Sequence, residues 1–535
     1  MPVRFLMIYP NNTGWAKVPL GIVYLLTILK QQGHEVRLFD MTFYGVDLDQ
    51  HHGDRRARRL NYRPVDLAPY GVVHQSCTME RVKSDLRQVV AEFKPDVIGL
   101  SIAEDTCLVG FELADAVRTS VQSRIIFGGV FCMAEPETVI AHRSVDIVCV
   151  GEGEVALPEL LEHLERGESI AEIEGLWVKA EDGTVVKNQV APPLDLDRLP
   201  YPDLSLIDDR HFYLPMAGHA YKMVHLASQR GCPRRCTYCC NQLFLEAYKP
   251  HIREYLGRKM SIPRFVDTLV HLKDTHGFNF FQIIDEDFLL RPLEDIRHFH
   301  ALYKDRVGLP FWIQAEANNV TDHKIRLLRD AGCMAIAIGI ETGSEFVRRE
   351  VYHRPTSKDA TLRAFEILHR YGIRTSGNVI VGAPHEGRDE VFESIELVRQ
   401  CQPRALNVNT LALYRGTKLR EYCVEKGYLD KDHMCDGRVP WAAVLDMPQI
   451  TKRETDALVR TFALYATLPK EYWPMIRKVE EDSEESDSIL ADLEGIYWRI
   501  AEERGMNFDV PGFDYDAFLR KRGEELAGRT EDGQG

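Results

Sequence analysis

The chain has 535 residues, of which 45% are hydrophobic and 27% are charged, and its formal net charge at pH 7 is −15. This ordinary globular composition excludes a collagen-like, low-complexity or wholly disordered protein. The acidic balance disfavours a general nucleic-acid coat and a polybasic membrane-surface protein, although it is compatible with one local basic site. At about 150 residues per domain, the length predicts three or so domains, each with its own core.

The sequence also carries signals about location. No run approaches the ~20 consecutive apolar residues of a transmembrane helix, and residues 1–12 lack the long apolar run and cleavage site of a signal peptide. Twelve cysteines in the whole chain are too few for a disulfide-stapled secreted scaffold. We therefore expect a cytoplasmic protein with no membrane span and no nucleic-acid partner.

Short apolar runs alternate with helical patterns through residues 1–170, which we interpret as the first domain. Helical spacing occurs at residues 21–30 and 79–93, and the expected strands lie at residues 3–9, 35–39, 96–102, 124–127 and 145–150. Nearly continuous apolar strands between helices indicate a parallel sheet covered on both faces. The pattern predicts a doubly wound, Rossmann-like α/β domain that binds its ligand beyond the carboxyl ends of the strands.

Loops at those strand ends supply the candidate ligand-binding residues of this domain. They are Ser101 at the end of the third strand with Ala103 and Glu104 after it, Gly128 and Gly129 after the fourth strand, and Gly151, Glu152 and Gly153 after the fifth. Glycines let backbone N–H groups approach a ligand, and the following helix N-terminus favours anionic groups. Residues 151–156, GEGEVA, formally match a dinucleotide fingerprint. Because the two glutamates would repel a pyrophosphate, tight structural turns are the favoured interpretation.

Two segments interrupt the regular pattern. The insertion at residues 42–78 contains HHGDRRARR at residues 51–59. We interpret it as a solvated excursion over the ligand crevice rather than a metal or phosphate site. Residues 171–220 are expected to form a linker, in which a hairpin signal around residues 181–183 precedes a proline-rich connector at residues 191–208.

Three cysteines follow a predicted strand at residues 223–228 with the spacing C-x3-C-x2-C, namely Cys232, Cys236 and Cys239. Three soft thiolates on one loop suit zinc or an iron–sulfur cluster. Structural zinc sites usually have four protein ligands, and no fourth partner stands at a comparable spacing. A four-iron cluster held by three thiolates keeps one iron open. We interpret the adjacent Cys240 as a bystander whose side chain points elsewhere.

Five further strand and helix units follow the cysteines. The strands are expected at residues 280–284, 311–315, 335–340, 378–381 and 406–411, and the helices at residues 263–276, 294–305, 322–331, 358–371 and 388–401. Together with the strand before the cysteines they make six units, which predicts a partial (β/α)6 barrel at residues 221–420. Acidic residues such as Asp285 and Glu341 stand at strand ends, where such barrels place their sites. Taken singly, each is also a common helix N-cap.

The last region, residues 421–535, is predicted to be helical. Helices are expected at residues 450–466, 488–503 and 515–527, and an acidic solvated stretch at residues 480–488 separates the first two. We expect Trp441, Trp473 and Trp498 to pack in the core rather than against a substrate. The final residues should be disordered.

These residues resemble the radical S-adenosylmethionine (SAM) superfamily. The resemblance rests on the C-x3-C-x2-C loop after the first strand of a six-unit barrel, and on IGIETGS (residues 338–344) and NVIVGAPHEG (residues 378–387), which are similar to later strand motifs of that family. The first domain is similar to the cobalamin-binding domain of the cobalamin-dependent branch, through PLGIVYLLTILKQQGHEVRLFD (residues 19–40) and VDIVCVGEGE (residues 145–154). The resemblance covers residues 1–420.

The resemblance implies a set of cofactors and ligands. Cys232, Cys236 and Cys239 would hold a [4Fe–4S] cluster whose open iron binds the amino and carboxylate groups of SAM. Asp285, Glu286 and Asp287 are expected near the methionyl amine. Glu341 and Asn378 would face the ribose or the methionine, the backbone of Gly382 would face adenine, and Tyr238 would pack on adenine or shield the cluster. Cobalamin would bind among the loops of the first domain.

The sequence departs from the expected patterns in two places. The motif D-x-H-x-x-G of mutase-type cobalamin domains is missing, and residues 100–111 contain no histidine. Cobalamin would then bind without a histidine ligand, with its lower face covered by the loop at residues 101–108. Glu316 stands where many relatives carry an arginine, which leaves the contact of the third barrel strand with SAM undetermined.

The activity that follows from the resemblance is a cobalamin-dependent radical SAM methyltransferase. It would act on an unactivated carbon, or phosphorus, of a small-molecule substrate, using methylcobalamin, a 5′-deoxyadenosyl radical and an external one-electron donor of the flavodoxin or ferredoxin type. The alternative is a cobalamin-dependent oxidative cyclase or ring-rearranging enzyme. A methylthiotransferase is disfavoured because the first domain has no second cysteine trio. A zinc-stabilised binding protein is the alternative from another class.

Overall fold

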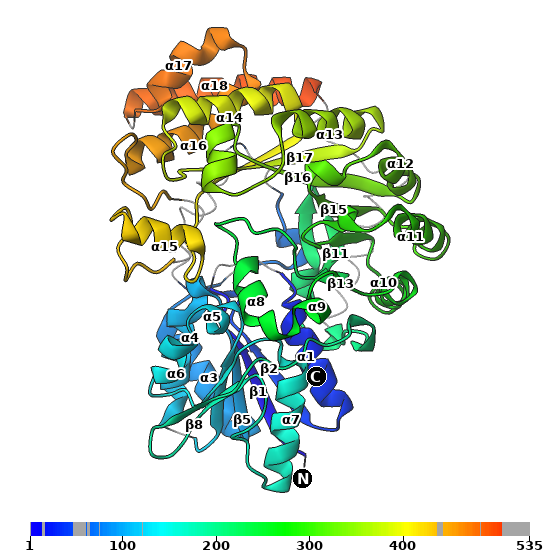
Figure 1. The fold of residues 1–535 in the computed structure, drawn as a ribbon, viewed down its shortest axis with the longest axis vertical. Helices are drawn as coiled ribbons and strands as arrows, with labels where there is room; N and C mark the ends of the chain where they lie inside the picture. Colours follow the sequence, from blue (N-terminus) through cyan, green and yellow to red (C-terminus); the bar gives the residue numbers. More distant parts are fainter. Residues whose placement is uncertain are drawn as a thin grey trace.

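The structure is a computed structural model, and it describes residues 2–12, 17–46, 60, 65–73, 75–119, 121–435, 442–481 and 483–504. Figure 1 shows two α/β lobes, one built by the N-terminal part of the chain and one by its middle, with helices of the C-terminal region packed on the second lobe. Within the described residues, no helix is both long and apolar enough to span a bilayer.

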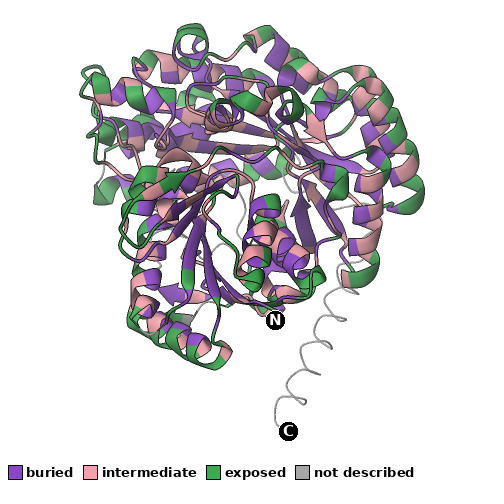
Figure 2. Cartoon of the chain, turned by 60° about the horizontal axis from the view of Figure 1, so that its bottom comes forward, coloured by how far each residue is buried: buried purple, intermediate pink, exposed green. Residues whose placement is uncertain are grey.

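The first lobe is built on a seven-stranded sheet of order β2-β1-β5-β6-β7-β8-β9. Its strands are β1 (Arg4–Tyr9), β2 (Glu35–Asp40), β5 (Val97–Ser101), β6 (Arg124–Gly128), β7 (Ile147–Cys149), β8 (Leu176–Lys179) and β9 (Val185–Lys187). The first five run parallel, as the apolar runs predict. The predicted doubly wound domain is therefore confirmed. Figure 2 shows that the strands of both lobes are mostly buried, as expected for sheets covered on both faces.

The predicted hairpin belongs to this sheet rather than to a free linker. Strand β8 pairs antiparallel with β7, and β9 pairs antiparallel with β8. The hairpin thereby covers the edge of β7, which would otherwise present unpaired backbone groups. The connector between the lobes begins only after β9.

Helices of the first lobe connect its parallel strands. They are α1 (Leu20–Gln31), α3 (Met79–Phe93), α4 (Cys107–Arg118), α5 (Val130–Ala134), α6 (Pro136–Ala141) and α7 (Gly153–Arg166). Part of the insertion forms β3 (Tyr44–Val46) and β4 (Gln75–Cys77), which pair in parallel. Residues 51–59, which carry HHGDRRARR, lie outside the described residues.

The second lobe is an open barrel. Its sheet has the order β10-β11-β14-β15-β16-β17-β18, with β10 antiparallel to β11 and the other six strands parallel. The strands are β10 (Tyr213–Met216), β11 (His219–Leu226), β14 (Phe280–Ile283), β15 (Phe311–Ala315), β16 (Cys333–Glu341), β17 (Arg374–Val381) and β18 (Ala405–Thr410). This confirms the predicted six-unit partial barrel.

The barrel helices match the predicted segments. They are α10 (Ile262–His276), α11 (Leu293–Arg306), α12 (Asp322–Asp330), α13 (Lys358–Arg370) and α14 (Arg388–Cys401). Burial alternates along β17, where Ser376 and Asn378 are half-buried while Thr375 and Gly377 are buried. This period of two places the first pair on the inner face of the barrel and the second pair toward the helices.

The C-terminal region adds α15 (Lys418–Glu425), α16 (Lys452–Thr467), α17 (Trp473–Val479) and α18 (Glu484–Glu503). The acidic stretch predicted as a solvated connection instead provides the first turn of α18. Ser483 caps that helix by accepting from the Ser486 N–H, and acidic side chains are favourable at a helix N-terminus. Trp473 packs edge-on against Phe392 and Tyr465, which confirms its predicted packing role. Trp441 and the helix predicted at residues 515–527 lie outside the described residues.

Candidate functional site

The three clustered cysteines lie on a loop between the two-residue strand β12 (Gln229–Arg230) and α8 (Asn241–Ala247). Gly231 begins the loop with a φ of +88°, and a Cβ there would lie 3.0 Å from the Tyr255 ring, so only glycine fits. Cys236 is buried, and Cys232 and Cys239 are half-buried. Strand β11 ends shortly before this loop, which therefore stands at the carboxyl edge of the barrel, as the sequence predicts.

Hydrogen bonds from three other segments hold this loop in place. The Gln242 side-chain amide donates to the carbonyls of Arg235 at 2.7 Å and Cys236 at 2.8 Å. The Thr237 hydroxyl donates to Val351 O at 2.6 Å, and Thr237 O accepts from Leu419 N at 3.0 Å. The loop is thus a fixed element rather than a free excursion.

The donor set fits an iron–sulfur cluster better than a single ion. Among the described residues, no three His, Cys, Asp or Glu side chains converge as one metal ion requires. Burial raises the pKa of the Cys232 thiol to about 11 and also raises that of Cys236. Because metal ligation replaces the proton of a thiol, these buried thiols suit a site in which iron supplies the positive charge.

Cys240 is closer to this site than the sequence suggests. Its thiol interacts with that of Cys239, which raises the pKa of Cys239 and lowers that of Cys240 to about 7. That Cys240 is a bystander to the three predicted ligands stays a prediction. The tight turn into α8 brings neighbouring side chains together, which an extended backbone would have separated.

Arg354 is a site residue that the sequence did not indicate. Its guanidinium lies 3.6 Å from the Glu341 carboxylate and donates to Gly339 O at 3.0 Å and to the Tyr238 hydroxyl at 3.4 Å. Its positive charge also acts on the Cys236 thiol, where it opposes the rise in pKa that burial causes. Arg354 follows a π-turn at residues 347–351, and no local motif marks such a position.

Glu341 occupies a strained position at the end of β16. Its φ is +60°, which is uncommon for a residue other than glycine, and the pairing register with β17 shifts between Gly339 and Glu341. Burial raises the pKa of its carboxyl group despite the nearby Arg354. Asn378 pairs with Gly339 across the strands, so the two predicted ribose or methionine ligands lie on neighbouring strands. Strained, buried acids of this kind are typical of functional sites.

The acidic triplet after β14 does not act as one group. Asp285 is fully buried and accepts from Ser228 N and Oγ, both at 2.5 Å, and from Gln229 N at 3.1 Å. It thereby fixes the strand end that leads into the cysteine loop. Asp287 accepts from Leu289 N and from the Asn319 amide, and burial raises its pKa to about 6.

Glu286 is the exposed member of the triplet. Its neighbours Asp285 and Asp287 already have several hydrogen-bond partners each, so Glu286 has the carboxylate best placed to meet a cation. The predicted contact of all three acids with the methionyl amine thus narrows to Glu286 as the favoured candidate.

Glu316 and Gly382 also have partners in the structure. The Glu316 carboxylate accepts from Arg234 of the cysteine loop and from the Thr356 hydroxyl, both at 2.7 Å, so the unusual acid at this place helps to hold the loop.

Gly382 N donates to Glu386 at 2.6 Å. Its predicted contact with adenine would therefore use its carbonyl oxygen rather than its N–H.

The predicted cobalamin loops lie at the carboxyl edge of the first sheet. Ser101 pairs with Gly128 in the β5–β6 register. Gly129 has a φ of +101°, and a Cβ there would lie 2.4 Å from Ile102 O, so the two loops approach too closely for any side chain. Ala103 N donates to the Thr106 hydroxyl at 3.0 Å, which closes the turn before α4.

Glu104 joins this edge to the segment around α15. Its carboxylate accepts from Arg415 N at 2.7 Å and from Cys435 N at 2.9 Å, and it lies 3.8 Å from the Arg420 guanidinium. Glu104 is buried. Its carboxylate therefore anchors the two lobes to each other.

The turn of Gly151, Glu152 and Gly153 makes a second connection to the barrel. Glu152 N donates to the Tyr248 hydroxyl at 2.9 Å, and its carboxylate accepts from Arg258 at 2.8 Å. Although burial opposes it, this hydrogen bond holds the pKa of Glu152 below its usual range. The acidic residues of GEGEVA thus serve contacts between the lobes, in agreement with structural turns and against a dinucleotide fingerprint.

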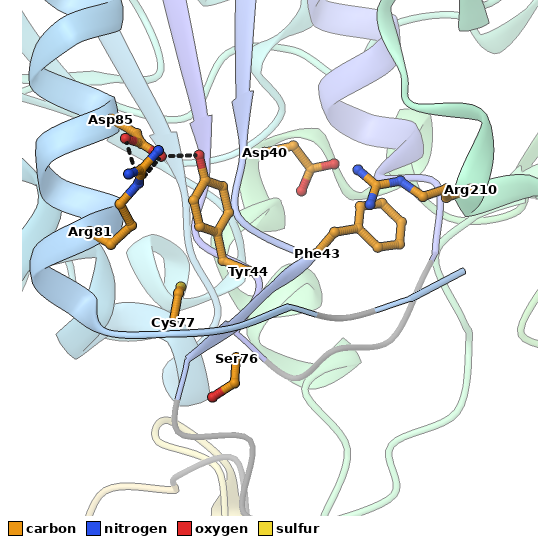
Figure 3. A pocket seen from close by; sticks show the side chains of 8 residues that line it. All are labelled: Asp40, Phe43, Tyr44, Ser76, Cys77, Arg81, Asp85 and Arg210. Atoms are coloured by element: carbon orange, nitrogen blue, oxygen red, sulfur yellow. Dashed lines mark hydrogen bonds and ion pairs between the residues drawn. The ribbon is translucent and has the colours of Figure 1, made fainter. Parts of the chain in front are cut away.

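A cavity of about 650 Å3 opens beside the end of β2 and the start of α3 (Figure 3). On one side Asp85 accepts from Arg81 at 3.0 Å and from the Tyr44 hydroxyl at 3.2 Å. Among the described residues that line the cavity, there is none of the predicted cofactor ligands. We therefore place the site at the cysteine loop and the strand-end loops described above, and not in this cavity.

Comparisons with known families agree with both lobes. The radical SAM superfamily model matches residues 226–398, and the B12 binding domain model matches residues 67–161. The first match contains the cysteine loop and the second contains the loops from Ser101 to Gly153.

Individual relatives share both parts. The chain is 23% identical over 460 residues to cytidylyl-2-hydroxyethylphosphonate methyltransferase of Streptomyces wedmorensis, covering 77% of this chain and 79% of that protein. It is 25% identical over 427 residues to anaerobic magnesium-protoporphyrin IX monomethyl ester cyclase of Rubrivivax gelatinosus, covering 76% and 67%.

Solved structures show the same fold. The cobalamin-dependent SAM radical enzyme OxsB, with aqua-cobalamin and SAM bound, matches with a TM-score of 0.62 at 16% identity, covering 98% of this chain and 84% of that chain. The radical SAM methyltransferase TsrM of Kitasatospora setae, with cobalamin and a [4Fe–4S] cluster bound, matches with a TM-score of 0.58 at 18% identity, covering 80% and 78%. With its cysteine loop in a radical SAM barrel and its strand-end loops in a B12-binding domain, the chain belongs to the cobalamin-dependent radical SAM enzymes.

Proposed function

We propose that the chain is a methyltransferase that transfers a methyl group to an unactivated carbon, or phosphorus, of a small molecule. Cys232, Cys236 and Cys239 would hold a [4Fe–4S] cluster. When bound, the cluster and SAM supply a radical that abstracts hydrogen from the substrate, and cobalamin carries the methyl group. The role of the protein is to position the cluster, SAM, cobalamin and the substrate.

One observation supports the proposal most strongly, namely that the carboxyl edges of the two parallel sheets meet. Glu104 follows β5 and binds the backbone of Arg415, which follows β18. Glu154, after β7, binds Arg230, which leads into the cysteine loop. Parallel α/β sheets bind ligands at their carboxyl edges. Ligands of the two domains would therefore face each other across a short distance, as a transfer between them requires.

The residues around the cysteine loop suit the binding of SAM. Glu286 offers an exposed carboxylate for a cationic amine. Glu341 offers a carboxylate and Asn378 an amide on adjacent strands. The positive charge of Arg354 lies near both the Glu341 carboxylate and the Cys236 thiol. These side chains would orient the bound molecule.

The second candidate is a cobalamin-dependent cyclase or ring-rearranging enzyme. It is favoured by the relative from Rubrivivax gelatinosus, whose identity of 25% is similar to the 23% of the methyltransferase from Streptomyces wedmorensis. The facing sheet edges suit either methyl transfer or cyclisation, so identifying the substrate and its product would distinguish the two reactions.

Product analysis separates the two candidates. Protein reconstituted anaerobically with iron, sulfide and cobalamin would be screened with small molecules for release of 5′-deoxyadenosine. Hits would then be incubated with SAM that carries a deuterated methyl group. Deuterium in the product supports methyl transfer, whereas a product with fewer hydrogens and no deuterium supports cyclisation. Preparations that bind one zinc and no iron would reject both.

A further inference from the structure

A row of uncharged amides lies on the inner face of the barrel at strands β17 and β18. Asn378 pairs with Asn407 in the register of these strands, and Asn409 follows two residues later. Residues paired across neighbouring strands point to the same face of a sheet, and Asn378 lies on the inner face. The alternate residues Leu406 and Val408 belong to the hydrophobic core that the surrounding helices share. We call Asn378, Asn407 and Asn409 the inner amide row.

The side chains of the inner amide row have free hydrogen-bonding groups. All three residues are half-buried, and none of the residues that the structure describes forms a hydrogen bond with their carboxamides. Other amides of the barrel are already used, since Gln314 donates to Ile284 O at 3.5 Å and Asn319 donates to Asp287 at 2.5 Å. A carboxamide offers two donors and one acceptor oxygen, and leaving them unpaired away from water is costly. The row is therefore equipped to bind a molecule rather than to hold the barrel together.

Large apolar side chains close the interior of the barrel below the row. Tyr221, Met223, Phe280 and Met334 form a buried cluster, and Trp312 packs against it. Except for those of β11, these residues stand at or next to the amino ends of their strands. A ligand of the inner amide row can therefore come only from the carboxyl edge, where the cysteine loop lies.

The level between this cluster and the row is made of small residues. Ser376 pairs with Ala337 on one side and with Ala405 on the other. One level higher, Gly339 pairs with Asn378. In closed barrels the same positions are mostly filled by bulky branched side chains. A molecule that enters from the carboxyl edge would thus lie against small residues, with the amides beside it.

The charged side chains around the row are already paired or lie far from it. Glu341, on the neighbouring strand β16, lies 3.6 Å from Arg354. Arg374, also on the inner face of β17, stands four residues before Asn378, which is about 13 Å along an extended strand. A charged group beside the row would lose water without gaining a counter-charge, which is unfavourable. Hydroxyl and amide groups would instead exchange water for the carboxamides.

We propose that the inner amide row binds the substrate and selects an uncharged molecule with several hydroxyl or amide groups. The inference rests on the proposed function and names its class of substrate. Strand β18 leads to Arg415, whose N–H donates to Glu104 of the first domain. A substrate on the row would thus lie between the strands that are expected to bind SAM and the domain that is expected to bind cobalamin.

Three fragments of the same shape and different charge test the assignment, namely acetamide, acetate and acetamidinium. Crystals of the reconstituted holoenzyme would be soaked in each fragment at the same concentration and at neutral pH, and the occupancy beside Asn407 and Asn409 would be refined. We expect acetamide to be ordered there, with an occupancy about threefold or more above that of either ion. In the variant Asn409→Asp, the new negative charge should shift this preference to acetamidinium.

The substrate found by the product screen gives a second readout. It should be uncharged at neutral pH, and Asn409→Leu should raise its KM about tenfold or more, because a site built for hydrogen bonds loses most when its groups stay unpaired. The matched control is Asn279→Leu. Asn279 is also half-buried, and its side chain has no partner among the described residues, but it stands before β14 at the amino end of the barrel. The control should keep the KM of the wild type.

Equal occupancy of the three fragments, or no ordered acetamide on the row, would overturn the inference and leave the proposed function intact. A charged substrate, or an equal rise of KM in Asn409→Leu and in the control, would do the same. The acetamidinium result in Asn409→Asp keeps the test informative if Asn409→Leu does not fold. Failure of the wild type to hold iron would instead overturn the proposed function, and this choice of substrate with it.

Discussion

Arg230 of the barrel and Glu154 of the B12-binding domain form an ion pair of 2.6 Å, directly before the glycine that begins the cysteine loop. Arg230 also lies opposite Arg258 in the short β12–β13 ribbon, where β13 is Arg258–Lys259. Like charges opposite each other destabilise such a pair. Glu152 and Glu154 neutralise the two arginines, so the first domain completes a structure that belongs to the second.

Replacing Arg230 should therefore loosen the contact between the domains. Arg230→Met leaves Glu154, whose side chain is 6% exposed, without its partner, which typically costs about 3–5 kcal/mol. We expect a lower midpoint of denaturation and weaker cobalamin retention on gel filtration. Adding Glu154→Gln to Arg230→Met should restore much of the stability, and a double variant as unstable as the sum of the single ones would contradict the coupling.

Alanine substitutions should show which of the four neighbouring cysteines bind iron. Alanine at Cys232, Cys236 or Cys239 is expected to abolish the broad absorption of the reconstituted cluster and the release of 5′-deoxyadenosine. Cys240→Ala should keep the iron, because it removes a neighbour of Cys239 rather than one of the three ligands. Iron and sulfide analysis checks both expectations, and loss of iron from Cys240→Ala would show that the ligand set has been assigned incorrectly.

Arg354 should act as a positioning residue for the cluster and SAM. Arg354→Met removes the charge between Glu341 and Cys236, so we expect the affinity for SAM to fall about tenfold and the electron paramagnetic resonance signal of the reduced cluster to respond less to added SAM. Arg354→Lys keeps the positive charge but loses the planar guanidinium. Its affinity for SAM should lie between those of the wild type and Arg354→Met. If Arg354→Met shows the wild-type spectral response, the residue has only a structural role.

Glu386 should make stability depend on pH. Burial raises its pKa to about 7 from an ordinary value of 4.5, so the folded chain holds a proton there that the unfolded chain has lost between these values. The free energy of unfolding should therefore fall as pH rises from about 4.5 to 7, by an amount on the order of 3 kcal/mol.

The variant Glu386→Gln tests this dependence. It keeps an oxygen that can accept from Gly382 N and Ala383 N, as Glu386 does at 2.6 and 3.1 Å, but it does not titrate. Denaturation curves at pH 5 and pH 7.5 should differ less for the variant than for the wild type. An identical pH dependence in both proteins would rule out Glu386 as its source.

The sequence by itself determined the order of the elements and the cysteine loop. Strands such as β1, β5 and β14 are local apolar runs between turns, and helices such as α10 and α13 start at serine caps, so short-range patterns specify them. The three cysteines were found because their ligand spacing lies within eight residues of chain. The sequence also predicted the hairpin. It did not show which sheet the hairpin joins, because pairing at a sheet edge depends on residues far apart in the chain.

Only the tertiary structure decided what each charged residue at a strand end does. Asp285, Glu286 and Glu104 look alike in sequence, yet Asp285 binds Ser228 and Gln229, Glu104 binds the backbone of Arg415 and Cys435, and Glu286 is exposed. Arg354 reaches the site from a turn without a motif. A carboxylate or guanidinium finds its partner through the packing of elements up to 331 residues apart, and no local pattern carries that information.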